Sequence, residues 1–397
     1  MIASGKQPNT ATKNKQRLNV NLRQYGILIA LVAIIAFFQV ATGGLLLAPN
    51  NVASLVQQNA YVFILTIGMT IVIIARHIDL SVGSVVAFVG GIVAIMMHQM
   101  NLPWLLACLL GILIGVLIGC WQGFWVAYVG IPAFIVTLGG MLIFRGLAIV
   151  LVEQTISGLP HGFVQVANGS VPNFLGYLHD CDAVTLWIGG FALAGLLWFS
   201  IRKRWKTKAT GRPVGSWAGF VTSLVILSLG IGVITYILSL SAGGTPIVLI
   251  IVGLLVLLYS FVLNKTVFGR HVYAVGGNLE AARLSGVKTK RVDFLVFVNM
   301  GVLAALAGII TTSRAGAAVA TAGNAYEMDA IAAAFIGGVA VTGGRGRISG
   351  AIIGALIMGV LNMGLSILNV DSAWQQAIKG LVVILAVAFD VISNKRR

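Results

Sequence analysis

The chain has 397 residues, of which 58% are hydrophobic and only 9% charged, and its formal net charge is +16. A soluble globular domain carries about 25% charged residues, so this composition excludes an ordinary soluble protein. Apolar stretches of about 18 residues or more recur along the chain, and each is long enough to cross the hydrocarbon core of a bilayer. The sequence therefore predicts an all-α, polytopic membrane protein.

The positive charges fall in loops between the apolar stretches. This placement is typical of the Lys and Arg bias of cytoplasmic loops and of attraction to anionic lipid headgroups. We therefore expect membrane lipids, and no nucleic acid, among its partners. The three cysteines form no CxxC or Cys/His cluster, so neither a disulfide framework nor a metal site is expected. They are Cys108, Cys120 and Cys181.

Residues 1–25 form a polar, basic tail before the first apolar run, 26–47. That run is longer than the roughly 7–15-residue core of a signal peptide, which predicts an uncleaved first span. The further apolar runs are 59–76, 84–100, 103–128, 131–152, 183–201, 217–240, 246–263, 293–312, 328–343, 350–368 and 376–393. Breaks near 77–83 and 130–132 are typical of broken or re-entrant helices, so we predict ten to twelve spans. A single transmembrane domain is expected over 26–393, with a basic C-terminus at 394–397.

The basic residues also predict an orientation. With the N-terminus in the cytoplasm and the spans alternating, 23 of the 26 Lys and Arg residues fall on the cytoplasmic side. The other three are Arg145, Arg314 and Lys379. By the positive-inside rule, both termini are expected in the cytoplasm. The cytoplasmic segments then include a basic loop at 202–216 and a longer loop at 264–292, and the longest external loop is 153–182.

Glycines at a spacing of four predict close helix packing. They place four residues on one helix face, which opens a groove for a neighbouring backbone. These residues are Gly111, Gly115, Gly119 and Gly123, and a second series is Gly346, Gly350 and Gly354. Residues 78–91 also resemble residues 344–359, since both have a Ser/Gly break before a glycine-rich span. Transporters are often built from repeated halves, so we predict two pseudo-repeated halves.

Two interior polar sites each leave two interpretations. Arg76, Asp79, Ser81 and Gly83 interrupt apolar sequence, and charged groups near the membrane edge are usually paired or hydrated. Their role is either local pairing, with Asp79 or Ser81 capping the next helix, or a cytoplasmic gate or partner contact. Arg145 is the most isolated interior charge. It either snorkels or binds backbone carbonyls, or it lines a permeation path.

The loop 264–292 is polar and basic. Asn278 is predicted to cap a short helix, Leu279 to Ser285, which Gly286 then closes. Such a helix is suited to fit a cleft on a soluble partner and to transmit movement to the flanking spans. An ordinary amphipathic loop helix explains the pattern equally well.

Within this loop, Glu280-Ala281-Ala282 and the following Gly286 match the EAA-x-x-x-G loop of permeases of ATP-binding-cassette (ABC) importers. The whole segment resembles the monosaccharide branch of these permeases, which contains the ribose, xylose and multiple-sugar permeases. Its further residues are Gly276, Gly277, Asn278 and Arg283. Residues 78–83, 132–139 and 326–333 resemble the same branch, and the insert at about 153–240 is most similar to the xylose permeases. The I-x-L-P tail of the general motif is absent at 296–299, which departs from the maltose-type arrangement. The resemblance implies instead a compact bundle with about ten core spans.

This resemblance implies a subunit that carries a monosaccharide, D-xylose above others, across the bacterial inner membrane. It implies three partners: a separate ABC ATPase at the loop 264–292, a soluble sugar-binding protein outside, and a second permease copy in a homodimer. The chain has no G-x-x-x-x-G-K-[ST] phosphate loop, so we expect neither an enzyme nor a cofactor of its own. ATP and Mg²⁺ would be bound by the partner ATPase.

The alternative is an ion-coupled secondary sugar transporter. Such a protein needs acidic side chains deep in its spans to carry the ion. The candidate carboxylates all lie near predicted span ends, which favours the ABC permease. They are Asp79, Asp293, Asp329 and Asp390.

Overall fold

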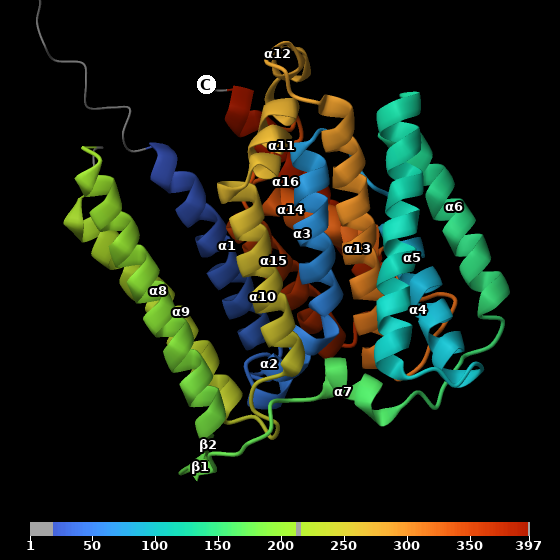
Figure 1. Ribbon diagram of the computed structural model, residues 1–397. Helices are drawn as coiled ribbons and strands as arrows, with labels where there is room; N and C mark the ends of the chain where they lie inside the picture. The colour runs from blue at the N-terminus through green and yellow to red at the C-terminus, as the bar shows by residue number, and fades with distance from the viewer. Residues whose placement is uncertain (1–18, 212–215, 396–397) are drawn as a thin grey trace, which may run out of the picture.

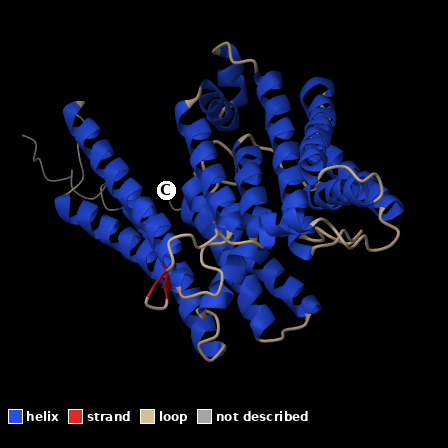
Figure 2. Ribbon diagram, turned by 60° about the horizontal axis from the view of Figure 1, so that its bottom comes forward, coloured by secondary structure: helices blue, strands red, loops and turns tan. Residues whose placement is uncertain are grey.

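The computed structural model describes residues 19–211 and 216–395, and most of them are helical (Figures 1 and 2). The helices before the one small sheet of this part of the chain are α1 (Asn19–Ala41), α2 (Pro49–Gln58), α3 (Ala60–Ile74), α4 (Val82–His98), α5 (Trp104–Phe124), the π-helical turn η1 (Trp125–Val129), α6 (Ala133–Leu151) and α7 (His161–Asn168). Strands β1 (Tyr177–Leu178) and β2 (Cys181–Asp182) form an antiparallel hairpin. The remaining helices are α8 (Ala183–Ala209), α9 (Trp217–Ser239), α10 (Ile247–Lys265), α11 (Val267–Gly277), α12 (Leu279–Leu284), α13 (Thr289–Ala315), α14 (Tyr326–Ile336), α15 (Ile348–Ile367) and α16 (Ser372–Lys395).

Each of the twelve predicted apolar runs overlaps a helix. Among the described residues, seven helices are long and apolar enough to cross a membrane, and α2 with α3, which meet at a bend of 44°, makes an eighth. Two predicted spans are shorter: α4 has 17 residues and α14 has 11. At about 1.5 Å per residue, neither helix reaches across roughly 30 Å of hydrocarbon. The ranges 84–100 and 328–343 are therefore not full-length spanning helices.

The helix ends collect on two opposite faces of the bundle. One face carries α12 and the C-terminal end of α16, and the other carries α7 and the β1–β2 hairpin (Figure 1). We call them the α12 face and the α7 face. The loop 264–292 lies at the α12 face and the loop 153–182 at the α7 face, on opposite sides as the alternating spans require. Residues 1–18, 212–215 and 396–397, which include much of the predicted basic tail and C-terminus, lie outside the described residues.

Two segment boundaries in the structure differ from those predicted from the sequence. The first helix begins at Asn19, so the predicted tail 1–25 overlaps it. The basic loop predicted at 202–216 is largely helical, because α8 continues to Ala209. Lysine and arginine are good helix formers, so a basic sequence does not by itself end a helix.

The core of the bundle forms around α13, which packs against α3, α4, α5 and α7. The glycine face of α5 makes the closest of these approaches. A Cβ added to Gly115 would lie 2.5 Å from the carbonyl oxygen of Gly301, and one added to Gly119 would lie 2.5 Å from that of Phe297. Gly123 faces the same helix. Three of the four glycines therefore let α5 and α13 meet backbone to backbone.

Gly111, the fourth member of the series, faces Val93 of α4 instead. The second series brings α15 against α14, since Cβ atoms on Gly350 and Gly354 would lie 2.3 Å and 2.0 Å from backbone carbonyl oxygens of α14 or its C-terminal cap. Small residues thus set the spacing of both close helix pairs.

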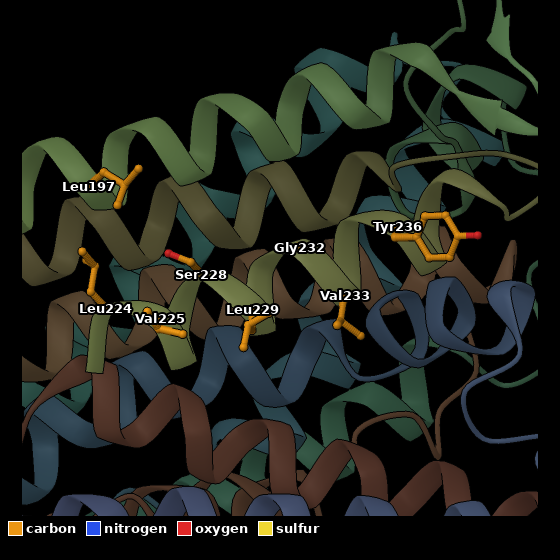
Figure 3. Close-up of a pocket in the computed structure, with 8 residues that line it drawn as sticks. All are labelled: Leu197, Leu224, Val225, Ser228, Leu229, Gly232, Val233 and Tyr236. Carbon is orange, nitrogen blue, oxygen red and sulfur yellow. The ribbon is translucent and has the colours of Figure 1, made fainter. Parts of the chain in front are cut away.

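Helices α8 and α9 form a hairpin at the edge of the bundle. They pack on each other and reach the other elements through α2 and β2, near the α7 face (Figure 1). An apolar groove of about 590 Å³ runs along this hairpin. Figure 3 shows Leu197 of α8 above a row of α9 side chains from Leu224 to Tyr236. Such an apolar surface is suited to lipid chains.

The α5–α13 contact predicts a position-specific sensitivity to side-chain size. We expect Gly119→Leu to lower the free energy of unfolding by about 1–3 kcal/mol or more, because the new side chain enters the space of the α13 backbone. The matched control is Gly253→Leu on α10, where an added Cβ meets nothing within 4 Å. Thermal unfolding of the detergent-solubilised variants measures the difference. Equal midpoints for both variants would contradict the close approach.

Candidate functional site

Helices α4 and α14 both begin in the interior of the bundle. Val86, one turn into α4, lies against Gly308 of α13, and Gly90 lies against Thr312. Since α13 has 27 residues and ends at Ala315, the first residue of α4 lies near the middle of α13. The chain therefore crosses half of the bundle as the non-helical segment 75–81 and the other half as α4. Correspondingly, α14 follows the non-helical segment 316–325.

The two interior helix starts touch through their backbones. A Cβ on Gly83 would lie 2.2 Å from the carbonyl oxygen of Gly323, and a Cβ on Gly323 would lie 2.1 Å from the carbonyl oxygen of Gly83. Gly323 also has a φ of +70°, which L side chains rarely adopt. Only glycine fits at either position, so the site depends on this reciprocal contact.

Side chains fix the segment that leads into α4. Both the Ser81 backbone N–H and its hydroxyl donate to Oδ1 of Asp79, at 2.9 and 2.6 Å, and the Gln122 amide donates to the Ser81 hydroxyl at 2.6 Å. Ser81 is the N-cap residue of α4, yet its side chain accepts no hydrogen bond from the helix. Capping by Ser81 is therefore not observed, and Asp79 orders the turn before the helix instead.

Arg145 fixes the segment that leads into α14. Its Nη1 donates to the carbonyl oxygens of Ala320 and Ala322 at 2.8 and 2.7 Å, and its charge attracts Glu327. This is the carbonyl-binding arrangement that the sequence offered as one of two interpretations. Polar backbone inside a bilayer must find partners, and an arginine from α6 supplies them here.

The predicted position near the span ends is wrong for two of the four carboxylates. Asp79 and Asp329, expected near span ends, are buried inside the bundle with 2% of their surface exposed. The reason is that α4 and α14 begin in the interior, so residues at their starts are not at the membrane edge. Asp293 does lie near a helix end, where His77 Nε2 is 3.2 Å from its Oδ1. The side chain of Asp390 lies outside the described part.

Asp329 is the centre of a buried polar cluster that joins three helices. It lies 3.2 Å from the Lys379 ammonium of α16 and accepts a hydrogen bond of 2.7 Å from the Tyr61 hydroxyl of α3. Tyr61 in turn stacks on Tyr326 with ring centroids 3.5 Å apart. Sequence reasoning missed this cluster. The signal was a carboxylate within one apolar run and a lysine within another, which in a membrane usually pair.

On the α12 face, the short helix lies where the sequence predicts it. It spans Leu279–Leu284, the Asn278 side chain accepts a hydrogen bond from Ala281 N–H at 3.0 Å, and Gly286 follows with a φ of +82°. Glu280 is exposed, and 88% of the Leu284 surface is open. Helix α12 therefore exposes an acidic residue and a large apolar side chain at the surface of the α12 face.

Arg76 links this loop to the interior. Its guanidinium donates to the carbonyl oxygens of Gly276 and Gly277 at 2.7 and 2.8 Å, and to that of Thr342 at 3.1 Å. A pairing of Arg76 with Asp79 is therefore not what orders the break. Arg76 instead brings together three segments far apart in the sequence: the end of α3, the end of α11 and the loop 337–347.

Two further contacts tighten the same junction. Gly344 N–H donates to the Ile74 carbonyl at 2.9 Å, and the Tyr273 hydroxyl donates to the Gly346 carbonyl at 2.8 Å. Burial raises the pKa of Tyr273 above its ordinary value, so the hydroxyl stays a donor. A Cβ on Gly276 would lie only 1.7 Å from the Ile74 carbonyl oxygen. We call this junction of α3, α11 and the loop 337–347 the Arg76 clamp.

The echo predicted between 78–91 and 344–359 differs from the observed correspondence. Residues 344–359 form part of the clamp and the first part of the full-length helix α15. The segment that corresponds to 78–91 in form is 316–336, since each contains an interior break followed by a short helix. Their contact at Gly83 and Gly323 relates the two parts of the bundle.

Similarity to known proteins agrees with this architecture. A family described as the permease component of branched-chain amino acid transport systems matches residues 50–387, and the chain belongs to this family of membrane permeases. The matched range includes both interior helix starts, the Arg76 clamp and α12.

Individual relatives are similar over nearly their whole length. The xylose transport system permease protein XylH of Haemophilus influenzae is 40% identical over 380 residues, which cover 96% of this chain and 98% of the relative. XylH of Escherichia coli K12 is 37% identical, covering 95% and 94%. The ribose import permease protein RbsC of the same strain is 35% identical, covering 93% of each chain. No solved structure matches the chain.

The buried ion pair predicts an asymmetric response to neutralisation. We expect Lys379→Met to cost about 3–5 kcal/mol of stability, because Asp329 remains buried without its cation. Asp329→Asn combined with Lys379→Met should recover a large part of this loss, since no unpaired charge remains. Thermal unfolding of both variants tests this. A double variant less stable than Lys379→Met alone would show that the charge of Asp329 is not balanced by Lys379.

Proposed function

We propose that this permease is the membrane subunit of a bacterial ABC sugar importer whose cargo is D-xylose. The named relatives support the substrate, since the two xylose permeases are 40% and 37% identical to this chain and the ribose permease 35%. The structural observation that carries the proposal is the Arg76 clamp, which connects the exposed helix α12 to both interior helix starts.

Three partners complete the proposed importer. An ABC ATPase docks on the α12 face and supplies the bound ATP and Mg²⁺, and a soluble sugar-binding protein docks on the α7 face. A second copy of this permease completes the pathway. The α12 face is then cytoplasmic, with both chain ends there, and the protein resides in the inner membrane. This orientation rests on the positive-inside rule. The chain's own role is transport, and hydrolysis belongs to the ATPase.

Coupling follows from the connectivity of the clamp. A displacement of α12 moves α11 directly, because Asn278 joins the two helices. The end of α11 is held by Arg76, which precedes Asp79 by three residues and the start of α4 at Val82 by six. Helix α11 is also bound to the loop 337–347, which directly follows α14, because the Tyr273 hydroxyl donates to the Gly346 carbonyl. One movement at the α12 face therefore acts on both helices whose starts meet at Gly83 and Gly323.

The interior charges suit an uncharged cargo. Arg145 is bound to backbone carbonyls, and Asp329 is bound to Lys379 and Tyr61. Each charge is therefore engaged in holding the fold. A neutral sugar needs no counter-charge along its path, so these charges do not have to be released to it.

Reconstitution in liposomes tests the proposed function. The purified chain alone should take up no D-xylose under a proton or sodium gradient. Uptake should appear when the ABC ATPase, the sugar-binding protein and ATP are supplied together, and a non-hydrolysable ATP analogue should abolish it. Gradient-driven uptake by the chain alone would instead identify an ion-coupled transporter.

The coupling loop is tested separately. We expect Glu280→Lys combined with Gly286→Asp to reduce ATP-driven uptake at least tenfold. The first change reverses the exposed charge, and the second places a side chain at a φ of +82°. Insertion in the membrane should be unchanged. The control is Glu153→Lys, the same charge reversal in an exposed loop of the α7 face. Normal uptake by the loop variant with the ATPase bound would refute a coupling role for α12.

A further inference from the structure

A second groove lies on the outer side of the bundle, between the basic end of α8 and the end of α10. Its volume is about 660 Å³, and its walls include Phe199, Arg202, Lys203 and Lys206 of α8 and Lys265 of α10. The groove is separate from α12, from the Arg76 clamp and from the interior helix starts. None of the functions proposed above uses it.

The groove is lined by basic residues, and no acidic residue lies near them in the sequence to balance their charge. Four of its residues are cations, Thr207 and Thr210 add hydroxyl groups, and none of its described lining residues is acidic. Indeed, no Asp or Glu occurs between Asp182 and Glu280, a stretch that contains eight Lys and Arg residues. The cations of α8 and Lys265 repel each other across the groove unless an anion lies between them.

The groove lies at the depth of the lipid headgroups. Helix α8 changes from apolar to basic directly after Ile201, and exposed Phe199 stands just before that change. Trp198, Trp205 and Trp217 are also exposed at this end of the hairpin, with 64–72% of their surfaces open. Exposed tryptophans are enriched at the boundary between hydrocarbon and headgroups. An anion in the groove is therefore within reach of a lipid whose acyl chain lies along Phe199.

The hairpin also needs a tether at this end. Its contacts with α2 and β2 are near the α7 face, and toward the α12 face it leans away from the bundle (Figure 1). Arg204 lies over the Trp217 ring at 4.4 Å, a contact that holds α8 to α9. The cations that line the groove face Lys265 of α10 instead. A bridging anion would join the hairpin to the bundle.

We propose that this groove binds the phosphate of an anionic phospholipid, held between Arg202, Lys203 and Lys206 of α8 and Lys265 of α10, and that this lipid fastens the α8–α9 hairpin to the bundle. An anionic phospholipid and free phosphate would both offer the groove a negatively charged phosphate group. The lipid rather than free phosphate is the occupant because the groove combines the cations with Phe199 at the hydrocarbon boundary. This inference does not depend on the identity of the sugar or of the ATPase.

Native mass spectrometry of the full-length, detergent-solubilised chain tests the proposal. The probes are phosphatidylglycerol, phosphatidylcholine with the same acyl chains, and inorganic phosphate. The wild-type chain should retain phosphatidylglycerol in preference to phosphatidylcholine. The triple variant Lys203→Ser, Lys206→Ser, Lys265→Ser should weaken phosphatidylglycerol binding by roughly a hundredfold, from the loss of three cations at a membrane surface.

The matched control removes three exposed cations from the same face outside the groove, in the variant Lys288→Ser, Lys290→Ser, Arg291→Ser. It should retain wild-type binding of phosphatidylglycerol. If both triple variants lost phosphatidylglycerol binding equally, the binding would depend only on the total positive charge of this face, and the proposed site would be refuted. Equal retention of both phospholipids would also overturn it, and competition by inorganic phosphate at similar concentration would make it a phosphate site instead.

A folding defect is separated by two further measurements. Each variant is compared with the wild-type chain by size-exclusion elution, and the single variant Lys265→Ser replaces the triple variant if that variant aggregates. Lys265 is exposed at the end of α10, so its loss leaves the apolar core intact. The single variant should still weaken phosphatidylglycerol binding severalfold, and unchanged binding in a well-folded single variant would refute a role for the α10 side of the groove.

Discussion

The contact of Gly83 with Gly323 is the constraint on which the interior of this permease depends. Two chain segments enter the bundle from opposite faces, turn and begin helices that point away from each other. Their backbones then approach closely enough that neither position has room for a side chain. A bilayer protein tolerates such non-helical backbone only where other groups satisfy it. Asp79 accepts from the Ser81 N–H before α4, and Arg145 donates to two carbonyl oxygens before α14. Gln122 holds the Ser81 hydroxyl.

The same arrangement accounts for the acidic residues in the interior. Glu327 and Asp329 lie in the first turn of α14. The first turn of a helix presents free N–H groups and a partial positive charge, which stabilises a carboxylate there. Lys379 then balances Asp329. The interior charges are thus a consequence of starting helices inside the bundle.

The sequence predicted the periphery of this protein better than its centre. Hydropathy located a helix in every predicted run, and the capping pattern at Asn278 and Gly286 located α12 closely, because both signals are local. The spacing of four in Gly111–Gly123 indicated a packing face, although not that Gly111 would meet α4. The half-length helices were missed because an apolar run has the same composition whether it crosses the whole bilayer or begins midway. The Asp329–Lys379 pair and the Arg76 clamp join residues 50 and about 200 to 266 positions apart, so they need the fold to be known.

The distance in sequence between Gly83 and Gly323 also bears on how the protein is made. The second glycine follows the first by 240 residues (323 − 83). At about 5–20 residues per second, a ribosome needs roughly 12–48 s to add that length. During this interval the start of α4 at Gly83 lacks the backbone segment that packs against it in the finished bundle, so the insertion machinery has to shelter it. The centre of the bundle is therefore completed late in biosynthesis, and a chain truncated before residue 323 would present an unfinished polar break to the membrane quality-control proteases.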